Sequence, residues 1–296
     1  MESIFVSIAS YNDSDINMTI NDCFQRASNP ERVWVGVLLQ ESNKRVVDDF
    51  QLWLESFKWK SNVILKTHHK ALGCGGARNI IMNELYNDSD YFWCIDSHSR
   101  FLQNWDTEYI SLYKELPAKG VISVFPLPYE FGQPYEEYAL NDVPPSIYIP
   151  NAPVWTNDFN DPQCKIPVTS KFEKVITISG GNLFGSGDIV DVIKVGDWKF
   201  HSQRDQEVYS LLLYKAGYDV FATNKSFIFH KYVHSYEATN GFYRELPNVN
   251  IPNYIDDFIG ELVDYGIEER SYLMWLSEYY KACDECRKLK LNEKPI

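Results

Sequence analysis

The sequence contains no long apolar run. No stretch approaches the roughly 18–20 apolar residues that a helix needs to cross a bilayer. The apolar start at residues 4–9 is too short for a signal peptide and has no basic leader before it. We therefore expect a protein that is not bound to a membrane and that lies in the cytoplasm, or in the host cytoplasm if it is viral.

Positive charge is also scarce. The chain has 28 Lys and Arg against 41 Asp and Glu, a formal net charge of −13. This acidic excess argues against nonspecific coating of nucleic acid, because a phosphate backbone attracts a surface with surplus cations. It does not exclude a local basic cleft.

A complete set of zinc-binding cysteines is lacking as well. Six cysteines occur, and the first four are scattered along the chain. Cys283 and Cys286 form a C-x-x-C pair, but no second ligand pair lies nearby to complete a structural zinc site. Because we expect no export signal, buried free thiols are the favoured state, which again indicates the cytoplasm.

Two common phosphate-binding motifs are missing. Residues 72–79, LGCGGARN, form a glycine-rich turn before a predicted helix. They match neither G-x-x-x-x-G-K-[ST] nor a good G-x-G-x-x-G, so a P-loop and a dinucleotide fold are disfavoured. Backbone N–H groups at Gly73 could still face an anion, and Arg78 could reach a phosphate. The alternative is an ordinary turn with a surface arginine.

Apolar and aromatic residues are plentiful, at 45% and 15% of the chain, enough for a sizeable core. In the first half, strand-like and helix-like segments alternate. Predicted strands cover residues 4–10, 32–40, 62–67 and 91–96. Predicted helices cover residues 16–27 and 50–57, and a third runs from the glycine-rich turn to about residue 86. This order predicts an α/β fold with a mostly parallel sheet flanked by helices.

The second half is less regular. Residues 125–167 are rich in Pro, Tyr and Asn and predict long loops over one face of the sheet. Strands are predicted at residues 175–178, 218–221 and 226–230. A helix is predicted over residues 203–216, closed by Gly217. The tail from residue 253 is predicted to be mainly helical and ends in a basic stretch.

The strongest local signal for chemistry is Asp96-x-His98, directly after an apolar strand. Ligand sites in open α/β sheets lie at the carboxyl ends of the strands. A carboxylate and an imidazole there suit Mn²⁺ or a related divalent ion. His230 also ends an apolar strand and is a candidate third ligand. The alternative is that Asp96 caps a turn and His98 is a surface residue.

Together these features resemble a known family. The chain resembles GT-A-type nucleotide-sugar glycosyltransferases, above all the cytoplasmic polypeptide α-N-acetylglucosaminyltransferases that act on hydroxyproline, Ser or Thr. The similar segments are residues 4–11, 35–40, 71–78 and 95–106, and more weakly residues 216–219 and His230. The likeness is good over roughly the first 125 residues and loose over 175–235.

The resemblance implies a GT-A domain over residues 1–235, with a nucleotide-binding half (1–125) and a sugar and acceptor half (126–235). Residues 236–296 would form a mainly helical extension. It also implies a UDP-sugar donor, Mn²⁺ or Mg²⁺, and transfer with retention to a protein hydroxyl. Asp96, His98 and His230 would hold the metal. The nucleotide-binding candidates are Ser10, Tyr11, Asn12, Gln40, Gly73, Arg78, Asp96 and Ser97. The catalytic candidates are Asp205 and Arg78.

The sequence departs from the family where the sugar and acceptor should lie. The stretch equivalent to the family's Gly-Glu-Glu element reads QRDQE here, at residues 203–207, and Asp205 is the favoured substitute for its first acid. The segment around Gly180 and Gly181 is more glycine-rich than expected. Possible sugar or acceptor platforms are Trp105, Trp155 and Trp198, although a tryptophan is more often part of the core.

The acceptor and the class of protein remain open. A basic cluster of Lys194, Lys199, His201 and Arg204 is best explained as a solvated face, since aspartates interrupt it. If it is functional, a phage-type enzyme that adds a hexose or pentose to hydroxymethylated DNA becomes attractive. A further alternative is a non-catalytic module that binds a nucleotide sugar or carbohydrate. The complete metal set argues against that module.

Overall fold

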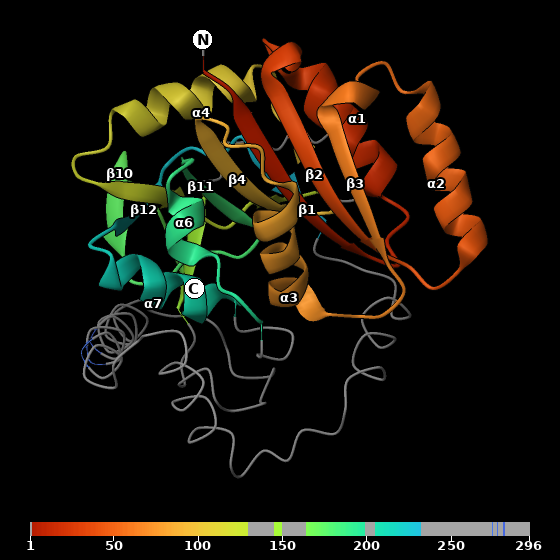
Figure 1. Cartoon of the computed structure of the whole chain (residues 1–296). Coiled ribbons are helices and arrows are strands. Elements are labelled where there is room, and N and C mark those ends of the chain that lie inside the picture. The colour runs from red at the N-terminus through yellow and green to blue at the C-terminus, as the bar shows by residue number, and fades with distance from the viewer. Residues whose placement is uncertain are drawn as a thin grey trace, which may run out of the picture.

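The protein is built around one large mixed sheet with helices on both faces (Figure 1). The computed structural model describes residues 2–129, 145–149, 164–198 and 205–231, together with Met274, Ser277 and Lys281. The division at residue 235 therefore stays a prediction, and the C-x-x-C pair lies outside the described residues. In the described part of the chain, no helix is long and apolar enough to cross a membrane.

The central sheet has eight strands in the order β10-β12-β6-β11-β4-β1-β2-β3. Their bounds are β1 Ile4–Tyr11, β2 Val33–Gln40, β3 Val63–His68, β4 Tyr91–Asp96, β6 Gly120–Ser123, β10 Phe172–Val175, β11 Asn182–Ser186 and β12 Asp219–Thr223. Strands β4, β1, β2 and β3 run parallel, as do β6 and β12, while β11 and β10 are antiparallel to their neighbours. The expected α/β fold with a mostly parallel sheet is confirmed.

The helices bury both faces of this sheet. They are α1 Ile16–Arg26, α2 Lys44–Ser56, α3 Gly73–Ile80, α4 Trp105–Lys114, α6 Ile189–Ile193 and α7 Asp205–Lys215. Apolar residues of α1, α2 and α4 share one core cluster with alternate residues of β1, and those of α3, α6 and α7 share the other. Strand β1 is thus covered on both sides, which explains why apolar residues occupy both of its faces.

A smaller sheet lies at the carboxyl ends of the central strands. Its order is β5 (Ser99–Phe101), β13 (Ile228–His230) and β7 (Leu127–Pro128). Strand β5 follows β4 after two residues and pairs antiparallel with β13, which places His230 opposite Ser99. This pairing brings the end of β13 to the end of β4.

Several predicted boundaries were wrong in the second half. The strand predicted at residues 175–178 is β10 and ends at Val175. Strand β11 was not predicted, because its sequence NLFGS is short and follows two glycines. Residues 125–167 were expected to be loops, but they include β7 and the pair β8 (Ser146–Ile149) and β9 (Cys164–Pro167). The predicted helical tail lies outside the described residues, apart from three isolated positions.

Candidate active site

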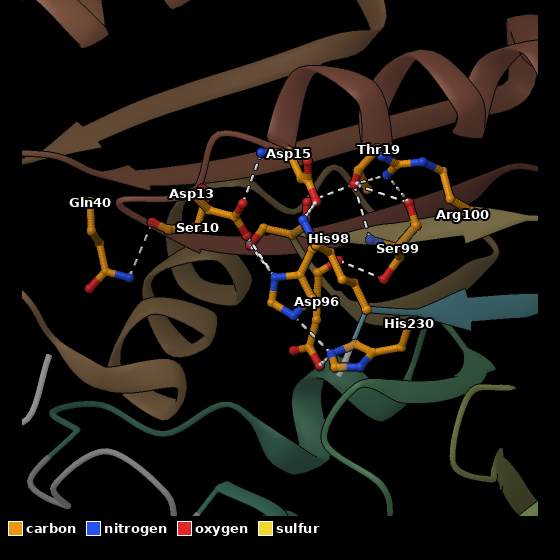
Figure 2. A network of polar contacts seen from close by, with 12 residues as sticks. Ser10, Asp13, Asp15, Thr19, Gln40, Asp96, His98, Ser99, Arg100 and His230 are labelled. Atoms are coloured by element: carbon orange, nitrogen blue, oxygen red, sulfur yellow. Dashed lines mark hydrogen bonds and ion pairs between the residues drawn. The ribbon is translucent and has the colours of Figure 1, made fainter. Parts of the chain in front are cut away.

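Asp96, His98 and His230 meet at the carboxyl edge of the sheet. Asp96 ends β4, His98 lies in the turn before β5, and His230 ends β13. One ligand atom from each lies within 4.8 Å of the other two. The structure therefore brings together the three residues that the sequence suggested as metal ligands (Figure 2).

The spacing of these atoms suits one divalent ion. The Nε2 atoms of His98 and His230 lie 2.8 Å apart, and Nε2 of His230 lies 3.1 Å from Oδ2 of Asp96. Two ligand atoms bound to one octahedral ion at about 2.1 Å lie about 3.0 Å apart. The side chain of His230 is 9% exposed and that of Asp96 is 27% exposed, so the site is partly open to solvent. The donor set of one carboxylate and two imidazoles thus fits the expected metal.

Arg78 lies between two carboxylates. Its Nη2 donates to Oδ1 of Asp96 at 2.7 Å, and its Nη1 donates to Oδ2 of Asp205. The side chains of Arg78 and Asp205 are only 3% and 4% exposed. The alternative of a surface arginine is therefore wrong. The two residues predicted to be catalytic form one buried ion pair beside the metal ligands.

The charge state of Asp96 follows from these neighbours. Burial alone would raise the pKa of its carboxyl group. The hydrogen bond from His230 and the charges of Arg78, His230 and His98 outweigh burial and hold the pKa of Asp96 well below its ordinary value. Asp96 is consequently ionised at neutral pH, as a metal ligand must be.

Asp13 contacts the other nitrogen of His98. Its Oδ2 accepts a hydrogen bond from Nδ1 of His98 at 2.7 Å and one from Oγ of Ser97. Burial tends to raise the pKa of Asp13, but the hydrogen bond and charge of His98 and the Ser97 hydroxyl lower it to about 2. Nothing local indicates this contact, because the two residues lie 85 positions apart.

The glycine pair before β11 has a steric cause. A Cβ atom on Gly181 would lie 2.4 Å from Oδ2 of Asp96, and one on Gly180 would lie 3.0 Å from Nη1 of Arg78. Real Cβ atoms essentially never lie closer than 3.0 Å to another heavy atom, so an alanine at residue 181 would force its surroundings to shift. The unexpected glycines therefore leave room for the Asp96 carboxylate and the Arg78 guanidinium.

The proposed nucleotide edge lies at the ends of β1 and β2. Ser10 is fully buried, and no described residue bonds its hydroxyl. Gln40 accepts a hydrogen bond from the backbone N–H of Leu72 at 2.7 Å, and its amide nitrogen lies 3.5 Å from the carbonyl oxygen of Ser10. Asn12 and Gly73 have φ angles of 46° and 76°, and α3 begins at Gly73. Gln40 thus braces the turn before α3.

The tryptophan candidates are placed differently from one another. Trp105 is fully buried and donates to the carbonyl oxygen of Cys23, so it belongs to the core. Trp198 packs against α3, where a Cβ on Gly75 would lie 2.0 Å from its ring. Trp155 lies outside the described residues, as do Lys199, His201 and Arg204 of the basic cluster, and Lys194 pairs with Asp191.

The fold is similar to that of solved glycosyltransferases. A structure of GalNAc-T7 with UDP, GalNAc and Mn²⁺ matches with a TM-score of 0.59 at 13% identity, over 93% of this chain and 56% of that chain. The structure of S. aureus TarS 1-349 matches with a TM-score of 0.50 at 10% identity, over 84% of this chain and 66% of that one. The complex of TarS 1-349 with UDP-GlcNAc matches with a TM-score of 0.51 at 11% identity, over 82% of this chain and 64% of that chain. This chain therefore spans little more than half of GalNAc-T7 and about two thirds of TarS 1-349.

These likenesses confirm the expected GT-A fold. No curated protein sequence is similar enough to count as a match. A family model described as Glycosyltransferase (GlcNAc) matches residues 3–56 and 53–240, which is most of the chain. Since that match includes the sheet and all three candidate metal ligands, the chain belongs to the glycosyltransferase (GlcNAc) family.

Proposed function

We propose that this protein is a metal-dependent glycosyltransferase that moves a sugar from a UDP-sugar to a hydroxyl group. The observation that carries this proposal is the convergence of Asp96, His98 and His230 at the carboxyl edge of the sheet. Two of the similar structures support it: that of GalNAc-T7 holds UDP, GalNAc and Mn²⁺, and that of TarS 1-349 holds UDP-GlcNAc.

In this proposal Asp96, His98 and His230 hold Mn²⁺, or Mg²⁺, against the diphosphate of the donor. A bound divalent ion stabilises the negative charge that develops on the leaving nucleoside diphosphate. Ser10, Tyr11 and Asn12 bind the nucleoside at the end of β1, with Ser97 and Gly73 nearby in the same edge. Gln40 acts indirectly, since its side chain contacts the backbone of Ser10 and Leu72.

Arg78 takes a role that fits its burial, and Asp205 keeps the role that the family resemblance gives it. Arg78 donates to Asp96 and to Asp205, so we assign it to orienting Asp96 rather than to a phosphate. Asp205 begins α7 and, in the family-based assignment, contacts the acceptor or a sugar hydroxyl. Their ion pair couples the metal side of the site to the sugar side.

The acceptor is proposed from the family resemblance to be a protein hydroxyl, with retention at the anomeric carbon. The DNA-modifying alternative depends on the basic cluster around residues 194–204, most of which lies outside the described residues. The transfer assay should therefore include both a protein hydroxyl acceptor and hydroxymethylated DNA.

The test is calorimetric titration of UDP with and without Mn²⁺, followed by measurement of UDP release from a panel of UDP-sugars. We expect UDP binding that requires Mn²⁺, and slow UDP release that increases with the right acceptor. Asp96→Asn should abolish both, while Asp48→Asn, on the exposed face of α2, should retain both. Metal-independent binding, or full turnover by Asp96→Asn, would contradict the proposal. Binding without any turnover would favour the non-catalytic module.

A further inference from the structure

The turn between β1 and α1 contacts both histidine-bearing segments. We call residues 12–15 the β1–α1 turn. Asn12 has a left-handed backbone, which asparagine tolerates better than most residues. Oδ1 of Asp13 accepts the backbone N–H of Asp15 at 2.8 Å, which closes the turn. The second oxygen of Asp13 is thereby directed at the site (Figure 2).

Asp13 determines which nitrogen of His98 carries the proton. An ionised carboxylate only accepts hydrogen bonds, so Nδ1 of His98, 2.7 Å away, must be the donor. In a neutral imidazole the lone pair then lies on Nε2, which faces Nε2 of His230. Metal-binding histidines commonly donate their other N–H to a carboxylate, which fixes the tautomer and the ring orientation. Ser97 donates to the same Asp13 oxygen and helps hold it in place.

Asp15 acts on His230 through Lys231, the next residue in the chain. Asp15 is 4% exposed, and its Oδ2 lies 3.0 Å from Nζ of Lys231. The backbone N–H of Lys231 donates to the carbonyl oxygen of His98 at 3.2 Å. The residue that follows His230 is therefore tied both to the β1–α1 turn and to the segment that carries His98.

We propose that Asp13 is a positioning residue for His98, and that Asp15, through Lys231, positions His230, so that one turn orients both imidazole ligands. This inference rests on the proposed metal-dependent function. It assigns the β1–α1 turn a role beyond contact with the nucleoside. It also accounts for the contacts of both aspartates, since Asp13 bonds His98 and Asp15 pairs with Lys231.

Asp13→Asn provides the sharpest test. If the oxygen of the new asparagine keeps the hydrogen bond from the backbone N–H of Asp15, the NH₂ group of the same side chain faces Nδ1 of His98. That group can only donate a hydrogen bond. The imidazole proton must then move to Nε2, where the metal should bind. We expect Mn²⁺ affinity, measured by electron paramagnetic resonance with UDP present, to fall about 10- to 100-fold. Lys231→Met should cause a smaller fall that Lys231→Arg restores.

A matched control separates positioning from folding. Asp106 is also buried and accepts the backbone N–H groups of Ser28 and Asn29, but it lies at the opposite edge of the sheet. Asp106→Asn should lower thermal stability without changing Mn²⁺ affinity. If Asp13→Asn binds Mn²⁺ as wild type does, the proposal is overturned.

A second readout needs no metal. Nitrogen-15 spectra of the six histidines, with His98 assigned through His98→Gln, report which ring nitrogen carries the proton. We expect Nδ1–H in wild type and Nε2–H in Asp13→Asn; an Nε2–H tautomer in wild type would overturn the proposal. If wild type binds no Mn²⁺ even with UDP, the proposed function fails, but the tautomer still decides whether Asp13 orients His98.

Discussion

The Nε2 atoms of His98 and His230 lie 2.8 Å apart, although the residues are 132 positions apart in the chain. The antiparallel pairing of β5 with β13 creates this contact, because it places His230 opposite Ser99. These two ring nitrogens and the neighbouring Asp96 carboxylate are close enough to bind one divalent ion together. The following predictions depend on this arrangement and on the contacts that support it.

His230→Gln should weaken Mn²⁺ binding by about ten-fold or more, because it removes one of three protein ligands and leaves a poor donor. Electron paramagnetic resonance titration of Mn²⁺ measures the effect. His69→Gln is the control, since His69 is exposed beyond the end of β3. Equal Mn²⁺ affinity in the His230 and His69 variants would show that His230 is not a ligand.

Arg78→Met should destabilise the protein by about 3–5 kcal/mol, because it leaves the buried carboxylate of Asp205 without its counter-charge. Urea denaturation monitored by tryptophan fluorescence measures the free energy of unfolding. Lys44→Met breaks an exposed pair with Asp48 on α2 and should cost no more than about 0.5 kcal/mol. Similar losses in the two variants would mean that the Arg78–Asp205 pair contributes little.

Gly181→Ala should displace the Asp96 carboxylate, since the added Cβ would lie 2.4 Å from Oδ2. We expect weaker Mn²⁺ binding and a lower melting temperature. Gly196→Ala is a matched control, because nothing lies within 4 Å of its Cβ position. The clash predicts non-additivity: in an Asp96→Ala background, Gly181→Ala should cause less further loss of stability than it does in wild type. Equal losses in both backgrounds would contradict this explanation.

Asp90→Asn should make stability less dependent on pH in acid. The backbone N–H and hydroxyl of Ser3 donate to Asp90 and lower its pKa. Because the folded pKa is below the unfolded value of about 3.9, the carboxylate contributes stability above that pH and loses it as the pH falls through the folded pKa. Urea denaturation gives the free energy of unfolding at each pH. We expect it to be larger for wild type than for Asp90→Asn at pH 7, and the difference to shrink as the pH falls. A gap that persists at the lowest pH would exclude this hydrogen-bond explanation.

Much of the fold could be predicted from local sequence patterns. Strands β1, β2 and β4 are apolar runs covered on both faces, so their composition indicates buried parallel strands without any tertiary information. The end of helix α7 at Lys215 was predicted within one residue, and Gly217 follows it with a φ of 74° as expected of a helix end. Strand β11 was missed because its own sequence is short and follows two glycines, while its pairing with β4 and β6 joins segments that are distant in sequence.

The sequence by itself determined the fold class and the candidate ligands Asp96, His98 and His230, because apolar periodicity and strand ends are local features. Only the tertiary structure decided that Arg78 is buried between Asp96 and Asp205, and that Asp13 bonds His98. These partners lie 18, 127 and 85 positions apart. Their contacts follow from how the strands, turns and helices pack at the edge of the sheet, which no local pattern encodes.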